Sequence, residues 1–128
     1  MKKQVLATIL CLCIVIGVIG GPIAHAKWTN TQTITLSLSL SNGTVTSEGT
    51  VRGKSGTSNI SVTFTLEKLV GNQYVYVDSW SDSSNSIYLG NTHYTNNCTS
   101  GTYKLTIAGT VTKGGVVEDI ENWFSKSL

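Results

Sequence analysis

The chain has 128 residues, a formal net charge of +2, and hydrophobic residues at 40% of its positions. Lys2 and Lys3 account for the whole charge, so the rest of the chain is formally neutral. A neutral chain with scattered charges lacks the basic patch typical of proteins that bind nucleic acid or anionic membrane surfaces. Cys11 and Cys13 lie in the leading apolar segment. Cys98 therefore stands alone in the remainder, which excludes an intrachain disulfide there.

Residues 1–26 have the three parts of a secretory signal peptide. Two lysines precede an apolar run from Val5 to Ile19, and Ala24-His25-Ala26 supplies small residues around a cleavage point after Ala26. We therefore expect residues 27–128 to be a secreted, extracellular domain whose only membrane contact is through the signal segment. A retained anchor is the alternative, because Val5–Ala24 is long enough to span a bilayer as a helix. The Gly-Gly-Pro sequence that follows the apolar run favours cleavage.

The first half of the domain reads as antiparallel strands. Thr33–Ser41 alternates leucine or isoleucine with serine or threonine, which predicts a strand with one packed face and one wet face. Asn42-Gly43 is the strongest short signal for a hairpin turn and leads into a return strand over Thr44–Gly53. After a loop over Lys54–Asn59, the alternation resumes in Ile60–Glu67 and predicts a core strand.

The second half continues the pattern with shorter strands. Tyr74–Trp80 is apolar on both faces and is predicted to be central or covered. Asp82–Ser86 is predicted to be a loop, Ile87–Leu89 a short strand, and Tyr94–Ser100 irregular. Two further strands are predicted at Gly101–Thr112 and Val116–Trp123, with a glycine-rich turn between them.

About seven short strands without an amphipathic helix are typical of an all-β sandwich or barrel. The segment Ser100–Leu105 resembles the penultimate strand of immunoglobulin-like and fibronectin-III-like domains, in which a tyrosine begins a corner and an aliphatic residue follows two positions later. Antibody-type domains would have a cysteine at Leu105, so the resemblance is to the architecture alone. It implies an antiparallel immunoglobulin-like β-sandwich preceded by the signal segment.

A second resemblance covers about a third of the domain. The loop Gly53–Thr57, the strand end Leu66-Glu67-Lys68 and the ending Ser79-Trp80-Ser81 are similar to small secreted, uncharacterised β-sandwich proteins of Gram-positive bacteria. This resemblance implies a bacterial origin and secretion, and it brings no known activity with it.

Catalytic chemistry has few candidates in this sequence. His93 is the single histidine outside the signal segment, so any serine or cysteine nucleophile would depend on it. Glu118, Asp119 and Glu121 lie together on one strand, where exposed charges discourage edge-to-edge aggregation. The Gly-Lys-Ser sequence at 53–55 lacks the upstream glycine of a phosphate-binding loop, and no loop has the spacing of an EF-hand. We therefore expect no enzyme, no cofactor and no metal site.

Aromatic side chains are the best candidates for a binding role, since exposed tryptophan and tyrosine rings stack on sugars or anchor protein partners. The candidate partner-binding residues are Trp28, Trp123, Tyr88 and Tyr94. The leading hypothesis is a non-enzymatic module that binds an extracellular protein or a cell-envelope ligand. A membrane-active protein that inserts the hairpin Thr33–Arg52 is the alternative. A monomer is expected, with a dimer linked through Cys98 as the other state.

Overall fold

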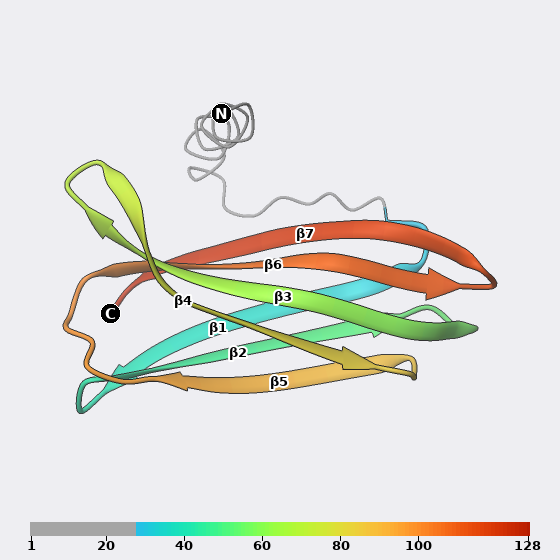
Figure 1. Cartoon of the computed structure of the whole chain (residues 1–128), viewed down its shortest axis with the longest axis horizontal. Helices are drawn as coiled ribbons and strands as arrows, with labels where there is room; N and C mark the ends of the chain where they lie inside the picture. Colours follow the sequence, from blue (N-terminus) through green and yellow to red (C-terminus); the bar gives the residue numbers. More distant parts are fainter. Residues whose placement is uncertain (1–27) are drawn as a thin grey trace.

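The computed structural model describes residues 28–128, and the expected signal segment with its cleavage point lies outside the described residues. The described part of the chain folds into seven strands without a helix (Figure 1). The strands are β1 (Thr31–Ser41), β2 (Thr44–Gly53), β3 (Thr57–Val70), β4 (Gln73–Ser84), β5 (Tyr88–Thr95), β6 (Thr102–Lys113) and β7 (Val116–Ser127).

Two antiparallel sheets face each other. One has three strands in the order β1-β2-β5, and the other has four strands in the order β4-β3-β6-β7. Figure 1 shows them as two layers, with the β3–β4 hairpin projecting beyond the rest at one end. The predicted all-β fold of about seven antiparallel strands in two sheets is confirmed.

The first hairpin forms as its sequence predicts. Asn42 and Gly43 have φ values of 49° and 77°, the left-handed values that a two-residue turn needs. This turn sets Ser41 opposite Thr44 and Leu40 opposite Val45. The apolar side chains of both strands therefore lie on the same inner face, and the serines and threonines lie on the outer face, except for the buried Ser47.

The core fills the space between the two sheets. Phe64 in β3 is almost fully buried, and it lies over Gly49 of the opposite sheet, where an added Cβ would be only 2.4 Å from the Phe64 Cε1 atom. Aliphatic side chains from both sheets surround this ring. The buried hydrophobic residues are Leu38, Val45, Val51, Ile60, Val62, Phe64, Leu66, Leu89, Tyr103, Leu105, Ile107, Val111 and Ile120.

The corner before β6 is fixed by a tyrosine. Tyr103 is buried, and its hydroxyl donates a hydrogen bond to the backbone oxygen of Thr99, 2.6 Å away. Its neighbour Cys98 donates its backbone N–H to the oxygen of Gly43, which joins this corner to the first hairpin turn. Burial, followed by the nearby Cys98 thiol, raises the pKa of Tyr103, so its hydroxyl remains a donor.

Two sequence-based predictions about β4 are wrong, and two segments predicted to lack regular structure are partly strand, since β3 begins at Thr57 and β5 extends to Thr95. Tyr74–Trp80 belongs to β4, an edge strand of the four-stranded sheet, and not to a central or covered strand. Both faces of this segment carry apolar side chains, but only one face is covered. Trp80 packs toward the core, whereas Tyr76 is exposed on the outer surface. Asp82–Ser84 extends β4 instead of forming a loop, because pairing with β3 overrides its polar composition.

Candidate functional site

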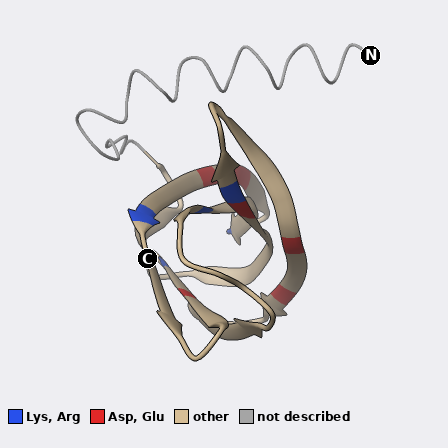
Figure 2. Ribbon diagram, turned by 90° about the vertical axis from the view of Figure 1, so that its left-hand side faces the viewer, with Lys and Arg blue, Asp and Glu red and all other residues tan. Residues whose placement is uncertain are grey.

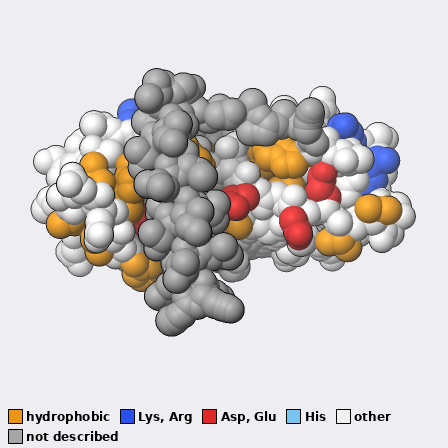
Figure 3. All heavy atoms as spheres, turned by 90° about the horizontal axis from the view of Figure 1, so that it is seen from above, with side chains coloured by type: hydrophobic (Ala, Val, Ile, Leu, Met, Phe, Trp, Pro, Cys, Tyr) orange, Lys and Arg blue, Asp and Glu red, His pale blue; other side chains and the backbone are white. Residues whose placement is uncertain are grey.

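The β3–β4 hairpin carries exposed apolar side chains. Leu69, Val70, Val75 and Tyr76 are all exposed and lie within eight consecutive residues around the turn. Seen from above in Figure 3, hydrophobic side chains are visible at the end where this hairpin projects and at the opposite end, near the β6–β7 turn. Large exposed apolar side chains that gather in one place usually mark an interaction surface.

A bulge in β4 determines which way this hairpin turns its aromatic rings. Leu66 pairs with Asp78, but the next residue of β3, Glu67, pairs with Tyr76, so Val77 is an extra residue in β4. One extra residue reverses the alternation of side chains along a strand. Tyr76 therefore faces outward with Glu67, although it is separated by two positions from the inward-facing Asp78.

Next to this bulge, a buried lysine lies between two rings on the outer face of the four-stranded sheet. The Lys104 side chain is only 6% exposed, and its Nζ atom lies 4.8 Å from the centre of the Tyr74 ring and 5.8 Å from that of Trp123. Glu67 Oε1 lies 3.9 Å from the same nitrogen. The cation therefore fixes two aromatic rings in place through cation–π contacts and offsets the charge of Glu67.

We define the aromatic patch as Leu69, Tyr74, Tyr76 and Trp123, on the outer face of the four-stranded sheet around Lys104 and Glu67. These side chains come from β3, β4 and β7, and pairing across the sheet brings them together. Rigid aromatic side chains on a sheet provide large contact area at low entropic cost. The patch is therefore suited to binding a partner.

Beside the aromatic patch, the same outer face has a shallow depression of 510 Å³. It is lined by the small residues Ala108 and Gly109 and by residues with hydroxyl groups such as Thr63 and Ser81. Enclosed small-molecule sites are mostly apolar and bury most of the ligand. This open depression therefore lacks the enclosure of a typical small-molecule site.

A polar cluster occupies the gap between the edge strands β4 and β5. The His93 Nε2 atom lies 2.9 Å from Asp78 Oδ2, and the Thr95 hydroxyl donates to the same oxygen at 2.8 Å. The Trp80 ring stacks on His93, with 3.9 Å between ring centres, and its Nε1–H donates to Asn91. These contacts join the two sheets along one edge.

The pKa of Asp78 reflects this environment. Burial by itself raises the pKa of the carboxyl group, but hydrogen bonds from His93, Thr95 and the Ser79 backbone N–H outweigh burial, so the pKa lies below its ordinary value of 3.8. Asp78 is thus an ionised acceptor and not a proton donor near neutral pH.

The His93–Asp78 pair does not form a catalytic triad. Ser47 lies opposite His93 in the neighbouring strand, and its hydroxyl is buried without a hydrogen-bond partner in residues 28–128. A serine covered in this way cannot reach a substrate, and the geometry supports a structural role for the cluster. Over the same residues, no group of three or more His, Cys, Asp or Glu side chains is arranged to hold a metal ion.

The four aromatic residues predicted from the sequence do not form one site. Trp123 belongs to the aromatic patch and is half-buried. Trp28 packs against the core just before β1. Tyr88 and Tyr94 are exposed on β5, in the other sheet. The sequence analysis did not identify Tyr74 and Tyr76 as candidates. A signal was present, because apolar residues on both faces of the strands flank this turn.

Cys98 is half-buried in the loop between β5 and β6. Its thiol lies 3.4 Å from the backbone oxygen of Thr95, to which it donates a hydrogen bond. The expected monomer and the alternative dimer linked through this thiol both stay predictions.

No protein-family model matches this sequence, and no curated protein or solved structure is significantly similar to it. In the part of the chain that the structure describes, no helix has the length and apolar character to cross a membrane.

Proposed function

We propose that the chain is a secreted, immunoglobulin-like binding domain, in which residues 1–26 are the signal peptide and residues 27–128 the functional unit. With strands lettered A to G in chain order, constant-type immunoglobulin domains place A, B, E and D opposite C, F and G. Here only the fourth strand has changed sheets. The bond from the Tyr103 hydroxyl to Thr99 has the geometry of a tyrosine corner and also supports this architecture.

The domain acts by binding a protein partner through the aromatic patch. The observation that carries this proposal is the concentration of exposed apolar side chains, since four of the nine exposed large hydrophobic residues in the described part of the chain lie within residues 69–76. Two of these four, Leu69 and Tyr76, belong to the aromatic patch itself. Two of the patch aromatics are already fixed by Lys104, so little side-chain entropy is lost on binding. Aromatic anchors of this kind dominate the energetics of protein interfaces.

The alternative of a membrane-active hairpin at Thr33–Arg52 has no support from the packing. Leu38, Val45 and Val51 of this hairpin are buried between the sheets, and Ile34, Leu36 and Leu40 pack against the same core. Its outer face is made of serines and threonines with Glu48 and Arg52, and these side chains do not favour insertion into hydrocarbon.

A matched pair of tyrosines tests the proposed interface. Tyr76 and Tyr94 are both 63% exposed, but only Tyr76 lies in the aromatic patch. Protein purified from the medium of cells expressing the full chain serves as bait for extracellular and envelope fractions, and calorimetry with the isolated partner gives Kd. We expect Tyr76→Ser to raise Kd about tenfold or more and Tyr94→Ser to leave it unchanged.

A second matched pair guards against general effects of surface hydrophobicity. Leu69 is 36% exposed in the aromatic patch, and Ile87 is 37% exposed in the turn between β4 and β5. Leu69→Ser should weaken partner binding, and Ile87→Ser should not. Equal losses in both members of either pair would contradict the assignment of the interface to the aromatic patch.

A further inference from the structure

The outer face of the three-stranded sheet differs in chemistry from the aromatic patch. Every outward position of β1 from 33 to 41 is serine or threonine, and β2 and β5 add Thr44, Thr46, Thr50 and Thr92. We call this surface the hydroxyl face. Glu48 and Arg52 are its only charged side chains within the described residues, one of each sign. Figure 2 shows how sparse charged residues are along the ribbon as a whole.

Most of these hydroxyls are not bonded to other protein groups. Within residues 28–128, Ser37 donates to Glu48 at 3.3 Å and Thr44 donates to Asn96 at 2.9 Å, and the other outward hydroxyls of the face have no protein partner. The opposite sheet differs, because there Thr63 and Ser81 bond to each other at 2.9 Å. The hydroxyl face therefore presents donors and acceptors to whatever lies against it.

The spacing of these hydroxyls is regular. β2 pairs with β5 without a register shift, and β1 pairs with β2 without one from Thr33 onward. The rows of side chains therefore repeat about every 4.8 Å across the strands and about every 6.8 Å along them. The four-stranded sheet has a bulge within its β3–β4 pairing and does not offer such a repeat. A regular surface suits a ligand that is itself a repeating polymer.

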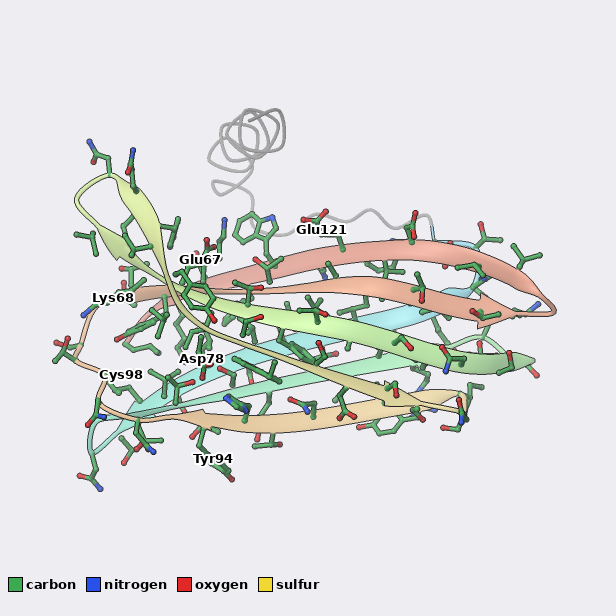
Figure 4. All side chains as sticks on the ribbon, in the orientation of Figure 1. Glu67, Lys68, Asp78, Tyr94, Cys98 and Glu121 are labelled. Carbon is green, nitrogen blue, oxygen red and sulfur yellow. The ribbon has the colours of Figure 1, made fainter. Side chains whose placement is uncertain are left out.

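An aromatic ring marks each end of this surface on β5. Tyr94 is 63% exposed, and in Figure 4 it points away from the body of the sandwich. Tyr88 lies flat along its own strand, since a Cβ at Gly90 would be 2.9 Å from the Tyr88 hydroxyl. The Arg52 guanidinium lies 5.1 Å from the centre of this ring. Six residues of strand separate the two tyrosines by about 20 Å.

We propose that the hydroxyl face binds an extended, uncharged polysaccharide, with sugar rings packed against Tyr94 and Tyr88 and sugar hydroxyls bonded to the serines and threonines between them. The C–H face of a pyranose ring is apolar and packs on an aromatic ring, while its hydroxyls match groups that both donate and accept. A face without net charge favours a neutral polymer over an acidic one. This site lies on the opposite sheet from the aromatic patch and goes beyond the proposed protein interface.

Affinity electrophoresis of the secreted protein in gels containing a neutral polysaccharide tests this proposal. The neutral probes are hydroxyethylcellulose, glucomannan and glycol chitin, and polygalacturonate is the acidic control. We expect retardation by at least one neutral probe and none by polygalacturonate, with retardation unchanged on raising the salt concentration. Tyr94→Ala should weaken binding about tenfold or more, and Tyr76→Ala, equally exposed on the other sheet, should not change it.

Removing one hydroxyl group separates the contribution of hydrogen bonds to polysaccharide binding from that of the aromatic rings. Thr92→Val keeps the shape of the side chain and removes its hydroxyl, so binding should fall by about two- to fivefold without loss of Tm. Thr110→Val makes the same change on the outer face of β6 and should have no effect. Failure of every neutral probe to retard the protein, equal retardation by polygalacturonate, or equal losses in Tyr94→Ala and Tyr76→Ala would overturn the proposal. These outcomes would not affect the proposed protein interface, provided that Tyr94→Ala still binds the protein partner.

Discussion

The two long edges of the sandwich, where its sheets approach each other, are closed by different means. At the β1–β7 edge, the segment before β1 crosses to the other sheet, and its hydrogen bonds there join a side chain to a backbone group. At the β4–β5 edge, most of the hydrogen bonds that join the two sheets among the residues described run from one side chain to another. The first edge depends on residues that precede the first strand. The second edge is built from residues within β4 and β5.

The β1–β7 edge is held by Asn30 and Glu118. The buried Asn30 side chain donates to the backbone oxygens of Val111 and Val116, each at 2.9 Å. Glu118 accepts hydrogen bonds from the backbone N–H groups of Thr29 and Asn30 and from the hydroxyl of Thr31. These bonds begin only three residues after the expected cleavage point, so processing after Ala26 would leave the edge intact. Processing a few residues later would remove its anchor.

At the β4–β5 edge, inward-facing side chains of the two strands alternate and bond to one another across the gap. The residues are Asp78, Trp80 and Asp82 of β4 and Asn91, His93 and Thr95 of β5. Their contacts are the hydrogen bonds Trp80–Asn91 at 2.8 Å and Asn91–Asp82 at 3.0 Å, together with the bonds that Asp78 accepts from His93 and Thr95. Because each contact uses a side chain, this edge can be altered by substitution without changing the backbone.

The largest effect is expected from Phe64, which lies between the two edges. Its ring stacks on Trp80 with 5.6 Å between centres and is almost fully buried. Phe64→Ala should lower the free energy of unfolding by about 3–5 kcal/mol through the cavity it creates. Urea unfolding of Phe64→Ala and of the exposed control Val117→Ala measures this difference. A Tm change of only a degree or two in Phe64→Ala would contradict the assigned core.

A smaller loss is expected at the β1–β7 edge. Asn30→Ala leaves two backbone oxygens without their donor, one of them on the buried residue Val111, and should cost about 1–3 kcal/mol. Asn72→Ala removes an amide from the exposed β3–β4 turn and serves as the matched control. The same stability in both variants would show that the anchor of β1 contributes nothing to closing this edge.

Some elements of the fold can be predicted from the sequence, and others cannot. Local patterns determine the β1–β2 hairpin, where alternation and Asn42-Gly43 agree, and the predicted return strand matches β2 at both ends. Position within a sheet is not local. Tyr74–Trp80 has the composition of a covered strand, but it lies at an edge because β6, and not another strand beside β4, occupies the far side of β3.

The candidate sites show the same limit. Tyr88 and Tyr94 were identifiable because both lie next to loop-like sequence, and both are exposed. The aromatic patch depends on the extra residue Val77 in β4, whose effect on Tyr76 is visible only once the register with β3 is known. The Lys104 contacts likewise join three strands, and no spacing within one strand predicts them.

The smallest predicted effect is an acid-induced loosening that should differ between the two edges. At the β1–β7 edge, burial raises the pKa of Glu118, but hydrogen bonds from Thr29, Asn30 and Thr31 outweigh it, so the pKa lies below the ordinary value of 4.5. At the other edge, the pKa of Asp78 lies below 3.8. A carboxyl group with a lowered pKa in the folded state stabilises the fold fully above its unfolded-state pKa. That contribution is lost as the pH falls through the folded-state pKa.

The contribution of Glu118 should therefore begin to fall below about pH 4.5, and that of Asp78 only below about pH 3.8. Urea unfolding at a series of pH values between about 6 and 2.5 measures the decline, and the variants Glu118→Gln and Asp78→Asn each remove one of its components. Glu118→Gln should flatten the upper part of the decline and Asp78→Asn the lower part. A decline that keeps its wild-type shape in both variants would mean that the charge of neither carboxylate contributes to closing its edge of the sandwich.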